Sequence, residues 1–138
     1  MELIRVYRER LAELAALQLG YKEEIGEERP AEEDFARLAE AMEKEQILFY
    51  GCLMEGKLVA CCSVTPGFST FNYRRSGVFE DFYILPAYRR RGIARELVQF
   101  AYRESGVSSL TVGCADCDLE MYQALGFRIS LGNLLAFE

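Results

Sequence analysis

Ile84-Leu85-Pro86-Ala87-Tyr88-Arg89-Arg90-Arg91-Gly92-Ile93-Ala94 is the stretch that decides the fold, because it joins a strand end, a basic loop and the first turn of a helix. Such a junction presents outward-facing backbone N–H groups, the positive end of a helix dipole and several guanidinium groups. Gly92 has no Cβ and lets the backbone approach an anion closely. The sequence therefore predicts a phosphate-binding junction between a strand and a helix.

Apolar spacing on either side of the junction predicts the remaining elements. Gly20 is the expected end of the first helix, and Pro66-Gly67 the expected end of the second strand. The order predicts an α/β (α+β) fold, with a mixed, mostly antiparallel central sheet and helices on both faces. We expect helices over 3–19, 30–45, 91–105 and 118–125, loops over 22–29 and 68–77, a hairpin turn at 55–57, strands over 47–54, 58–65, 78–85 and 109–112, and one or two final strands over 127–137.

Length and composition indicate one globular domain. The chain has 138 residues, of which 51% are hydrophobic, so we expect a single domain over 1–138. Its longest apolar runs are too short to span a bilayer, and the segment Met1–Arg5 lacks the apolar core of a secretory signal. We therefore predict a cytoplasmic protein without a membrane partner.

The excess negative charge lies in the first third of the chain. Residues 1–47 hold seven basic and thirteen acidic side chains, whereas residues 48–138 hold nine of each. This balance argues against a nucleic-acid partner. The acidic residues are either the solvated faces of two amphipathic helices or a rim that attracts cationic substrates.

The cysteines do not indicate a metal centre. Cys114-x-x-Cys117 has the spacing of a zinc or redox pair, but the chain has no histidine and no second such pair. The other three cysteines (Cys52, Cys61 and Cys62) lie in apolar runs, where a free thiol behaves as a small hydrophobe. We expect no metal, and any acid–base chemistry has to come from Glu, Asp, Tyr, Lys or Cys.

Two adjacent carboxylates interrupt the strand predicted over 78–85. Both faces of this strand are largely apolar, as in a central strand covered on both sides, yet one face carries Glu80 and the other Asp81. A buried, unpaired carboxylate is costly. Either residue could pair with Arg74, Arg75 or a backbone N–H. Because the strand leads directly into the phosphate-type loop, we favour a functional role for at least one of them.

The junction and a short segment near residue 122 together carry a resemblance to a known family. Arg89-x-x-Gly92-x-Ala94 resembles the R/Q-x-x-G-x-G/A signature of the GCN5-related N-acetyltransferases (GNAT). Tyr122-x-x-x-Gly126-Phe127 resembles their second motif, with the family's spacing. The match covers roughly residues 47–130. Two positions depart from the family, which often has asparagine and alanine where this chain has Ala115 and Asp118.

The resemblance implies the acyl-CoA N-acyltransferase fold and acetyl-CoA as co-substrate. Backbone groups of Arg89–Ala94 would hold the diphosphate, and the strand edge Phe82–Ile84 would pair with pantetheine. The expected cofactor-binding residues are Phe82, Tyr83, Ile84, Arg89, Arg90, Arg91, Gly92, Ile93, Ala94 and Arg95.

The same resemblance suggests roles for the carboxylates and for Tyr122. Residues 80–84 are similar to the strand of polyamine acetyltransferases, in which the first acid deprotonates the amine and the second binds it. Strict alternation puts Glu80 and Asp81 on opposite faces, so both reach one cleft only if the strand bulges. We predict that Glu80 is the general base, Asp81 binds substrate and Tyr122 is the general acid for the thiolate.

These residues predict direct acetyl transfer to a primary amine. A small cationic metabolite (a polyamine, amino acid or aminoglycoside) is the favoured acceptor. One alternative is a peptide N-terminus or lysine side chain, with segment 68–77 as a groove wall, and another is a non-catalytic acyl-CoA-binding module. Binding of RNA or nucleotide phosphates by the arginines is disfavoured by the net charge. Members of this family are often dimers, so a homodimer stays open.

Overall fold

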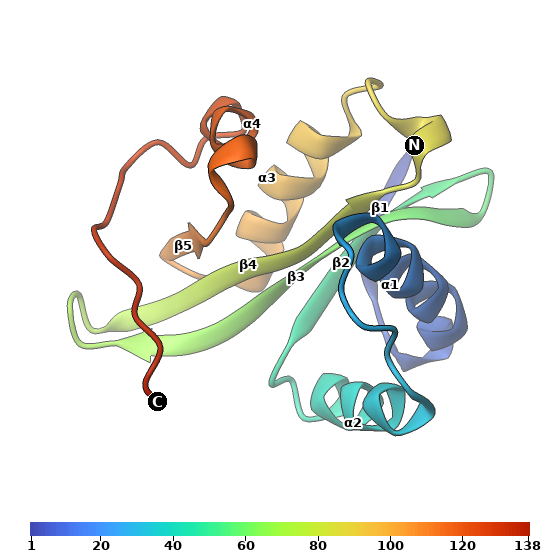
Figure 1. Ribbon diagram of the computed structural model, residues 1–138, viewed down its shortest axis with the longest axis horizontal. Helices are drawn as coiled ribbons and strands as arrows, with labels where there is room; N and C mark the ends of the chain where they lie inside the picture. Colours follow the sequence, from blue (N-terminus) through green and yellow to red (C-terminus); the bar gives the residue numbers. More distant parts are fainter.

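The computed structural model describes residues 1–138 and contains a five-stranded sheet in the order β1-β2-β3-β4-β5 (Figure 1). Strands β1 to β4 are antiparallel to their neighbours, and β5 runs parallel to β4. The predicted mixed, mostly antiparallel sheet is therefore confirmed. The elements are β1 (Glu2–Val6), α1 (Leu11–Ile25), α2 (Glu32–Glu43), β2 (Leu48–Met54), β3 (Lys57–Ser69), β4 (Arg74–Ile84), α3 (Ile93–Ser105), β5 (Ser109–Val112) and α4 (Leu119–Ala124), with single 3-10 turns at Arg8–Arg10, Pro86–Tyr88 and Asp116–Asp118.

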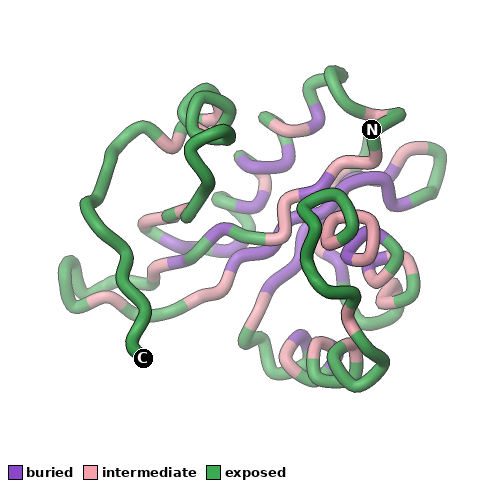
Figure 2. Tube along the Cα trace, viewed as in Figure 1, coloured by how far each residue is buried: buried purple, intermediate pink, exposed green.

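The sheet separates two apolar clusters, which lie on its opposite faces. On one face, the apolar stripe of α3 packs on the central strands, and Leu97 and Ala101 are fully buried in the same cluster as Phe79. On the other face, Leu14 and Leu17 of α1 pack with residues of β2 and β3. Figure 2 shows that burial is concentrated in the central strands and in the helix turns that face them. Helices thus cover both faces, as predicted.

The first five residues after Met1 form a strand, so the predicted helix over 3–19 is wrong at its start. In β1, Leu3 joins the cluster beneath α3, whereas Ile4 and Val6 join the cluster beneath α1. Pairing with β2 imposes this alternation. Because each face of the strand carries both apolar and charged residues, its sequence also fits helical spacing, and only the pairing distinguishes the two.

Helix α1 extends beyond Gly20, which was the predicted stop, and includes the first part of the predicted loop over 22–29. A Cβ on Gly20 would lie 3.0 Å from the Tyr83 hydroxyl oxygen, so glycine here provides room for a neighbouring ring. The helix ends at Gly26, whose φ of 75° is the left-handed conformation typical of a helix terminus. No helix of the protein is long and apolar enough to cross a membrane.

The predicted strand end at Pro66-Gly67 is also wrong, because β3 continues to Ser69 and β4 begins at Arg74. Segment 68–77 is therefore mostly the far end of a hairpin, which extends beyond the other strands (Figure 1). Pro66 pairs with Gly77, and β2 pairs with β3 only as far as Val64. The proline thus lies where one edge of β3 has no neighbouring strand. Its missing N–H therefore costs the sheet no hydrogen bond.

No strand forms over residues 127–137, in contrast to the prediction. Phe127 packs against the cluster beneath α3, but the chain after it has no regular element. Five apolar side chains of this segment are exposed: Ile129, Leu131, Leu134, Leu135 and Phe137. Their composition favours a strand, but a strand also needs a hydrogen-bonded neighbour, which this segment does not have.

Gly51 offers a test of how closely the sheet packs beneath α1. A Cβ there would lie 2.9 Å from the backbone oxygen of Ala60 and 2.5 Å from Leu58 Cδ1. We expect Gly51→Ala to destabilise the protein by about 1–3 kcal/mol because the core has to move to accept the methyl group. Thermal unfolding followed by circular dichroism measures the effect. Gly67→Ala is the matched control, since its Cβ would make only a 3.5 Å contact, and equal melting of the two variants would contradict the prediction.

Candidate active site

A β-bulge in β4 brings the two predicted carboxylates to one face of the sheet. Cys61 of β3 pairs with Tyr83 of β4. Two residues further along β3, Ser63 pairs with Glu80, which is three residues before Tyr83. The extra residue is accommodated by Asp81, whose φ is 56°. The Ser63 hydroxyl, opposite Glu80, donates a 2.6 Å hydrogen bond to Asp81 Oδ2. Both carboxylates therefore lie on the face that α1 and α2 cover.

The helices leave part of this face open. Glu80 is exposed and belongs to no ion pair, while Asp81 is half-buried and has Ser63 as its hydrogen-bond partner. Val78, one pleat before Glu80 on the same face, is 42% exposed. The prediction that this strand is covered on both sides thus fails over residues 78–80. The opening leaves an uncompensated carboxylate accessible to a cation.

Tyr21 of α1 lies beside this pair, a placement that sequence analysis missed. Burial raises the pKa of the Tyr21 phenol, and the negative charges of Asp81 and Glu80 raise it further. The Tyr21 ring meets Tyr83 edge to face, with 6.2 Å between centroids. Because the predicted helix stops at Gly20 and the predicted loop begins at residue 22, Tyr21 falls outside both predicted segments. Its position one turn after Leu17, on the buried side of α1, is the signal that could have identified it.

Strands β4 and β5 separate next to the carboxylates. They pair only over Ser76–Phe79 and Ser109–Val112, so one backbone edge of β4 has no strand neighbour from Glu80 onward. The predicted pantetheine edge, Phe82–Ile84, lies in this unpaired part. Backbone N–H and C=O groups on such an edge are available to an extended ligand.

The loop before α3 has the features of an anion site. Arg90 and Gly92 both have positive φ, 64° and 82°. In α3 the first helical hydrogen bond runs from Glu96 N–H to Gly92 O, so the N–H groups of Ile93, Ala94 and Arg95 have no helical acceptor. A Cβ on Gly92 would contact nothing, so its conformation, not crowding, requires glycine. These donors and the helix dipole fit a diphosphate.

The arginines around this loop point in different directions. Arg89 forms two 2.9 Å hydrogen bonds to the carboxylate of Glu24, at the end of α1. Arg95 lies 3.5 Å from the carbonyl oxygen of Ala124, at the end of α4. Arg90 and Arg91 are exposed, and Arg91 stacks over the ring of Tyr88. Only Arg90 and Arg91 therefore present guanidinium groups that are free of protein acceptors, whereas Arg89 and Arg95 brace neighbouring helices.

Tyr122 flanks the open edge of β4 from the opposite face. Its ring packs with Phe79, Phe82 and Phe127, at centroid distances between 5.8 and 6.5 Å. Burial raises the pKa of the Tyr122 phenol to about 12, and Tyr21 contributes to the shift. Tyr122 thus packs on Phe79 and Phe82, the residues that flank Glu80 and Asp81 in β4, next to the unpaired edge of the strand.

The family of the chain follows from its sequence match. Residues 45–129, more than half of the chain, match the family described as acetyltransferase (GNAT) domain. The chain belongs to the GNAT acetyltransferase family. The resemblance drawn from the loop and from Tyr122 is thereby confirmed, and the protein is an acyltransferase of the GNAT type.

Solved structures share the complete GNAT fold with this chain. A predicted acetyltransferase with acetyl-CoA from Clostridium acetobutylicum has a TM-score of 0.80 at 13% identity, over 99% of this chain and 95% of the other. An aminoglycoside acetyltransferase with sisomicin from an uncultured soil metagenomic sample has a TM-score of 0.80 at 14% identity, over 99% and 94%. Ribosomal-protein-alanine N-acetyltransferase from Brucella melitensis biovar Abortus 2308 has a TM-score of 0.80 at 16% identity, over 100% of both chains. No curated protein matches the sequence. The likeness establishes the fold, and the neighbours differ in substrate.

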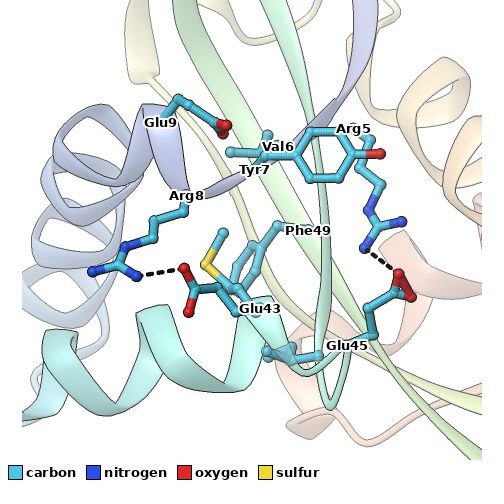
Figure 3. A pocket seen from close by; sticks show the side chains of 10 residues that line it. Arg5, Val6, Tyr7, Arg8, Glu9, Glu43, Glu45 and Phe49 are labelled. Carbon is cyan, nitrogen blue, oxygen red and sulfur yellow. Dashed lines mark hydrogen bonds and ion pairs between the residues drawn. The ribbon is translucent and has the colours of Figure 1, made fainter.

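A separate cavity of about 500 Å³ lies between β1 and the end of α2 in this GNAT protein (Figure 3). None of the predicted site residues lines it. Its arginines are paired, Arg5 with Glu45 at 3.7 Å and Arg8 with Glu43. Phe49 on its floor pairs with Ser63, which in turn pairs with Glu80, so cavity and carboxylates share one face of the sheet. The cavity lies about two strand spacings, roughly 10 Å, from Glu80.

The cysteines of this GNAT protein fall into two groups. Cys52, Cys61 and Cys62 are buried, in agreement with their apolar surroundings, and burial raises the pKa of all three thiols. Cys114 and Cys117 are exposed between β5 and α4. No three His, Cys, Asp or Glu side chains form a group that could hold a metal ion.

Proposed function

We propose that this GNAT protein transfers the acetyl group of acetyl-CoA directly to a primary amine of a small cationic metabolite, such as a polyamine, amino acid or aminoglycoside. The observation that carries the proposal is the bulge in β4, which turns Glu80 and Asp81 to the same face beside an open strand edge. Two carboxylates without a cationic partner at this edge suit a cationic acceptor.

Acetyl-CoA fits the two donor arrays next to the carboxylates. The diphosphate is held by the N–H groups at the start of α3, with Arg90 and Arg91 adding positive charge. Pantetheine pairs with the unpaired edge at Phe82–Ile84. The thioester then lies at the unpaired edge of β4. From the face that carries Glu80, the amine can reach the carbonyl carbon of the thioester.

Glu80 acts as the general base because the acceptor has to lose a proton. A lysine-like amine with a pKa of about 10.4 is neutral in only about one molecule in 2,500 at pH 7, which corresponds to roughly 4.6 kcal/mol. Attack of the amine nitrogen forms the C–N bond, and the surplus proton passes to Glu80, directly or through water. Its exposed, unpaired carboxylate is suited to accept that proton and release it to solvent.

Tyr122 acts as the general acid on the leaving group. Cleavage of the C–S bond releases a thiolate, which needs a proton or a hydrogen bond. The phenol, with its pKa raised to about 12, remains protonated at neutral and moderately alkaline pH, and its ring is fixed by three phenylalanines. Acid and base thus approach the acetyl group from opposite faces of β4.

Asp81 selects acceptors by charge, which yields a testable effect. Asp81→Asn keeps the side-chain size and tolerates the left-handed backbone but removes the negative charge. We expect the KM of a dicationic amine to rise about tenfold, and that of a monocationic amine of equal length to change less. Steady-state kinetics with the two amines measures the difference. An equal effect on both amines would assign Asp81 a structural role through Ser63.

A peptide acceptor is the second candidate. The extension of β3 and β4 beyond the sheet exposes Phe68, Phe71 and Tyr73, which could form one wall of a peptide groove. A non-catalytic acyl-CoA-binding module is the third candidate, and the retention of Glu80 and Tyr122 weighs against it.

The test is release of free CoA thiol from acetyl-CoA in the presence of polyamines, amino acids, aminoglycosides and short peptides. Amine-dependent release by small cations supports the proposal, and release by peptides alone supports the second candidate. Acetyl-CoA binding without release across the whole panel would favour the binding module.

A further inference from the structure

We propose that Glu24, in the last turn of α1, is a positioning residue for the acetyl-CoA loop, acting through the guanidinium of Arg89. This inference rests on the proposed function, because it concerns how the diphosphate site keeps its shape. The loop is residues 85–92, which connect β4 to α3. Glu24 itself lies outside the two motifs that resemble the GNAT family.

The contact between α1 and the loop is a bidentate ion pair between Glu24 and Arg89, referred to below as the clamp. Arg89 Nη1 and Nη2 each donate a 2.9 Å hydrogen bond to one oxygen of Glu24. Arg89 Nε donates a third, at 2.8 Å, to the carbonyl oxygen of Ile84 at the end of β4. One planar guanidinium therefore joins three elements: α1, β4 and the loop. Bidentate arginine–carboxylate pairs are stronger and more directional than ordinary surface ion pairs.

Aromatic side chains beneath the clamp connect Arg89 to the part of β4 that carries the two carboxylates. The Arg89 guanidinium lies over the ring of Tyr83, 5.5 Å from its centroid. Tyr83 in turn packs on Gly20 and meets Tyr21. The pKa of the Tyr21 phenol is raised by burial and by the negative charges of Asp81 and Glu80. The last two turns of α1 thus contact both the cofactor loop and Tyr83, two residues after Asp81 in β4.

Leu85 and Tyr88 at the start of the loop pack against the core, but residues 89–92 have few restraints besides the clamp. The backbone hydrogen bonds of the loop are local, from Tyr88 N–H to Leu85 O and from Arg89 N–H to Pro86 O, except at its two ends, where Leu85 N–H bonds to Val59 O and Glu96 N–H bonds to Gly92 O. Arg90 and Gly92 hold left-handed conformations, which direct the N–H groups outward. Among the ion pairs of the protein, only Glu24–Arg89 connects this loop to another element. The clamp therefore maintains the conformation that binds the diphosphate.

Electrostatics alone predicts the opposite effect of removing Glu24. A carboxylate near an anion site repels the diphosphate, so its loss without any positioning role should tighten acetyl-CoA binding. A positioning role predicts weaker binding instead. We expect Glu24→Gln to raise the Kd of acetyl-CoA about fivefold, and Arg89→Lys, which loses the planar fork, to do the same. The double variant should be no weaker than the worse single variant, since both remove one contact.

Isothermal titration calorimetry gives the Kd values, and hydrogen–deuterium exchange of residues 85–92 without ligand reports the loop directly. Glu24→Gln should exchange faster in this segment, raise the KM of acetyl-CoA and leave kcat nearly unchanged. Glu40→Gln is the matched control, because it breaks the Glu40–Lys44 pair on α2, far from the loop. It should leave affinity and loop exchange as in the wild type.

The outcomes separate this inference from the proposed function. Weaker binding by Glu24→Gln together with faster loop exchange supports the positioning role. Equal or tighter binding by Glu24→Gln, with normal binding by the wild type, overturns it and leaves the proposed function intact. Absence of acetyl-CoA binding by the wild-type protein overturns both. A loss of affinity in Glu40→Gln as large as that in Glu24→Gln also overturns the inference.

Discussion

The Glu80→Gln variant is expected to lose about 10²–10⁴-fold in kcat for acetyl transfer, the range typical of a removed general base. The substitution keeps the size and hydrogen-bonding capacity of the side chain but cannot accept a proton. Glu80 is exposed and unpaired, so its loss leaves no buried charge without a partner and should not lower stability. The KM of acetyl-CoA should stay the same, because the diphosphate and pantetheine contacts lie on other residues.

The pH profile separates loss of a base from general damage. Without Glu80, the rate has to follow the neutral fraction of the amine, which rises about tenfold per pH unit below the amine pKa. The deficit of Glu80→Gln should therefore shrink as the pH rises towards 10. Glu33→Gln, an exposed carboxylate substitution on α2, is the control and should retain wild-type kinetics. A constant deficit at all pH values would assign Glu80 to binding instead.

The Tyr122→Phe variant is expected to lose about 10²-fold in kcat, near the lower end for general acid catalysis. Phenylalanine preserves the ring packing with Phe79, Phe82 and Phe127, so we expect the thermal midpoint and the KM of acetyl-CoA to stay near wild type. Thiol release measures kcat, and calorimetric titration with acetyl-CoA measures binding. Equal kcat in both proteins would exclude Tyr122 as the acid.

The raised pKa of Tyr122 also predicts how kcat depends on pH in the alkaline range. At pH 10 an ordinary tyrosine is half ionised, whereas a phenol with a pKa of about 12 is only about 1% ionised. The raised pKa means that the folded protein keeps the protonated form until the pH rises through 12. Wild-type kcat should therefore show no loss of the proton donor between pH 8 and 10, and the ratio of wild-type to Tyr122→Phe rates should stay constant there. A falling ratio would contradict the role of a buried, protonated phenol.

Local sequence signals predicted the parts of the fold that lie close together in the chain. The β2–β3 hairpin, the amphipathic helix α3 and the turn around Gly92 all occur where their residues indicated. Each depends on interactions across a few residues: a turn, a helical stripe or a helix start. Errors arose where a distant partner decides, as in β1, which needs β2, and in segment 127–137, which has no strand neighbour.

In the candidate site, too, local sequence signals predicted some features, and contacts between distant residues decided others. The roles proposed for Glu80, Asp81, Tyr122 and the loop come from residue types, spacing and the family resemblance. The direction of each side chain could not be inferred from them. Asp81 lies on the same face of β4 as Glu80 only because a bulge opposite β3 adds one residue to β4. The register of such a strand pair depends on the side chains of both strands.

By itself, the sequence determined the family and the central sheet with its two helical layers, and it supplied the candidate residues for proton transfer. Only the tertiary structure decided that both carboxylates share one face, that Tyr21 packs against Tyr83 in the same strand, and that Arg89 pairs with Glu24. Glu24 and Arg89 are 65 residues apart in the chain. Contacts of that separation form through packing of whole elements, so no local pattern of residues can encode them.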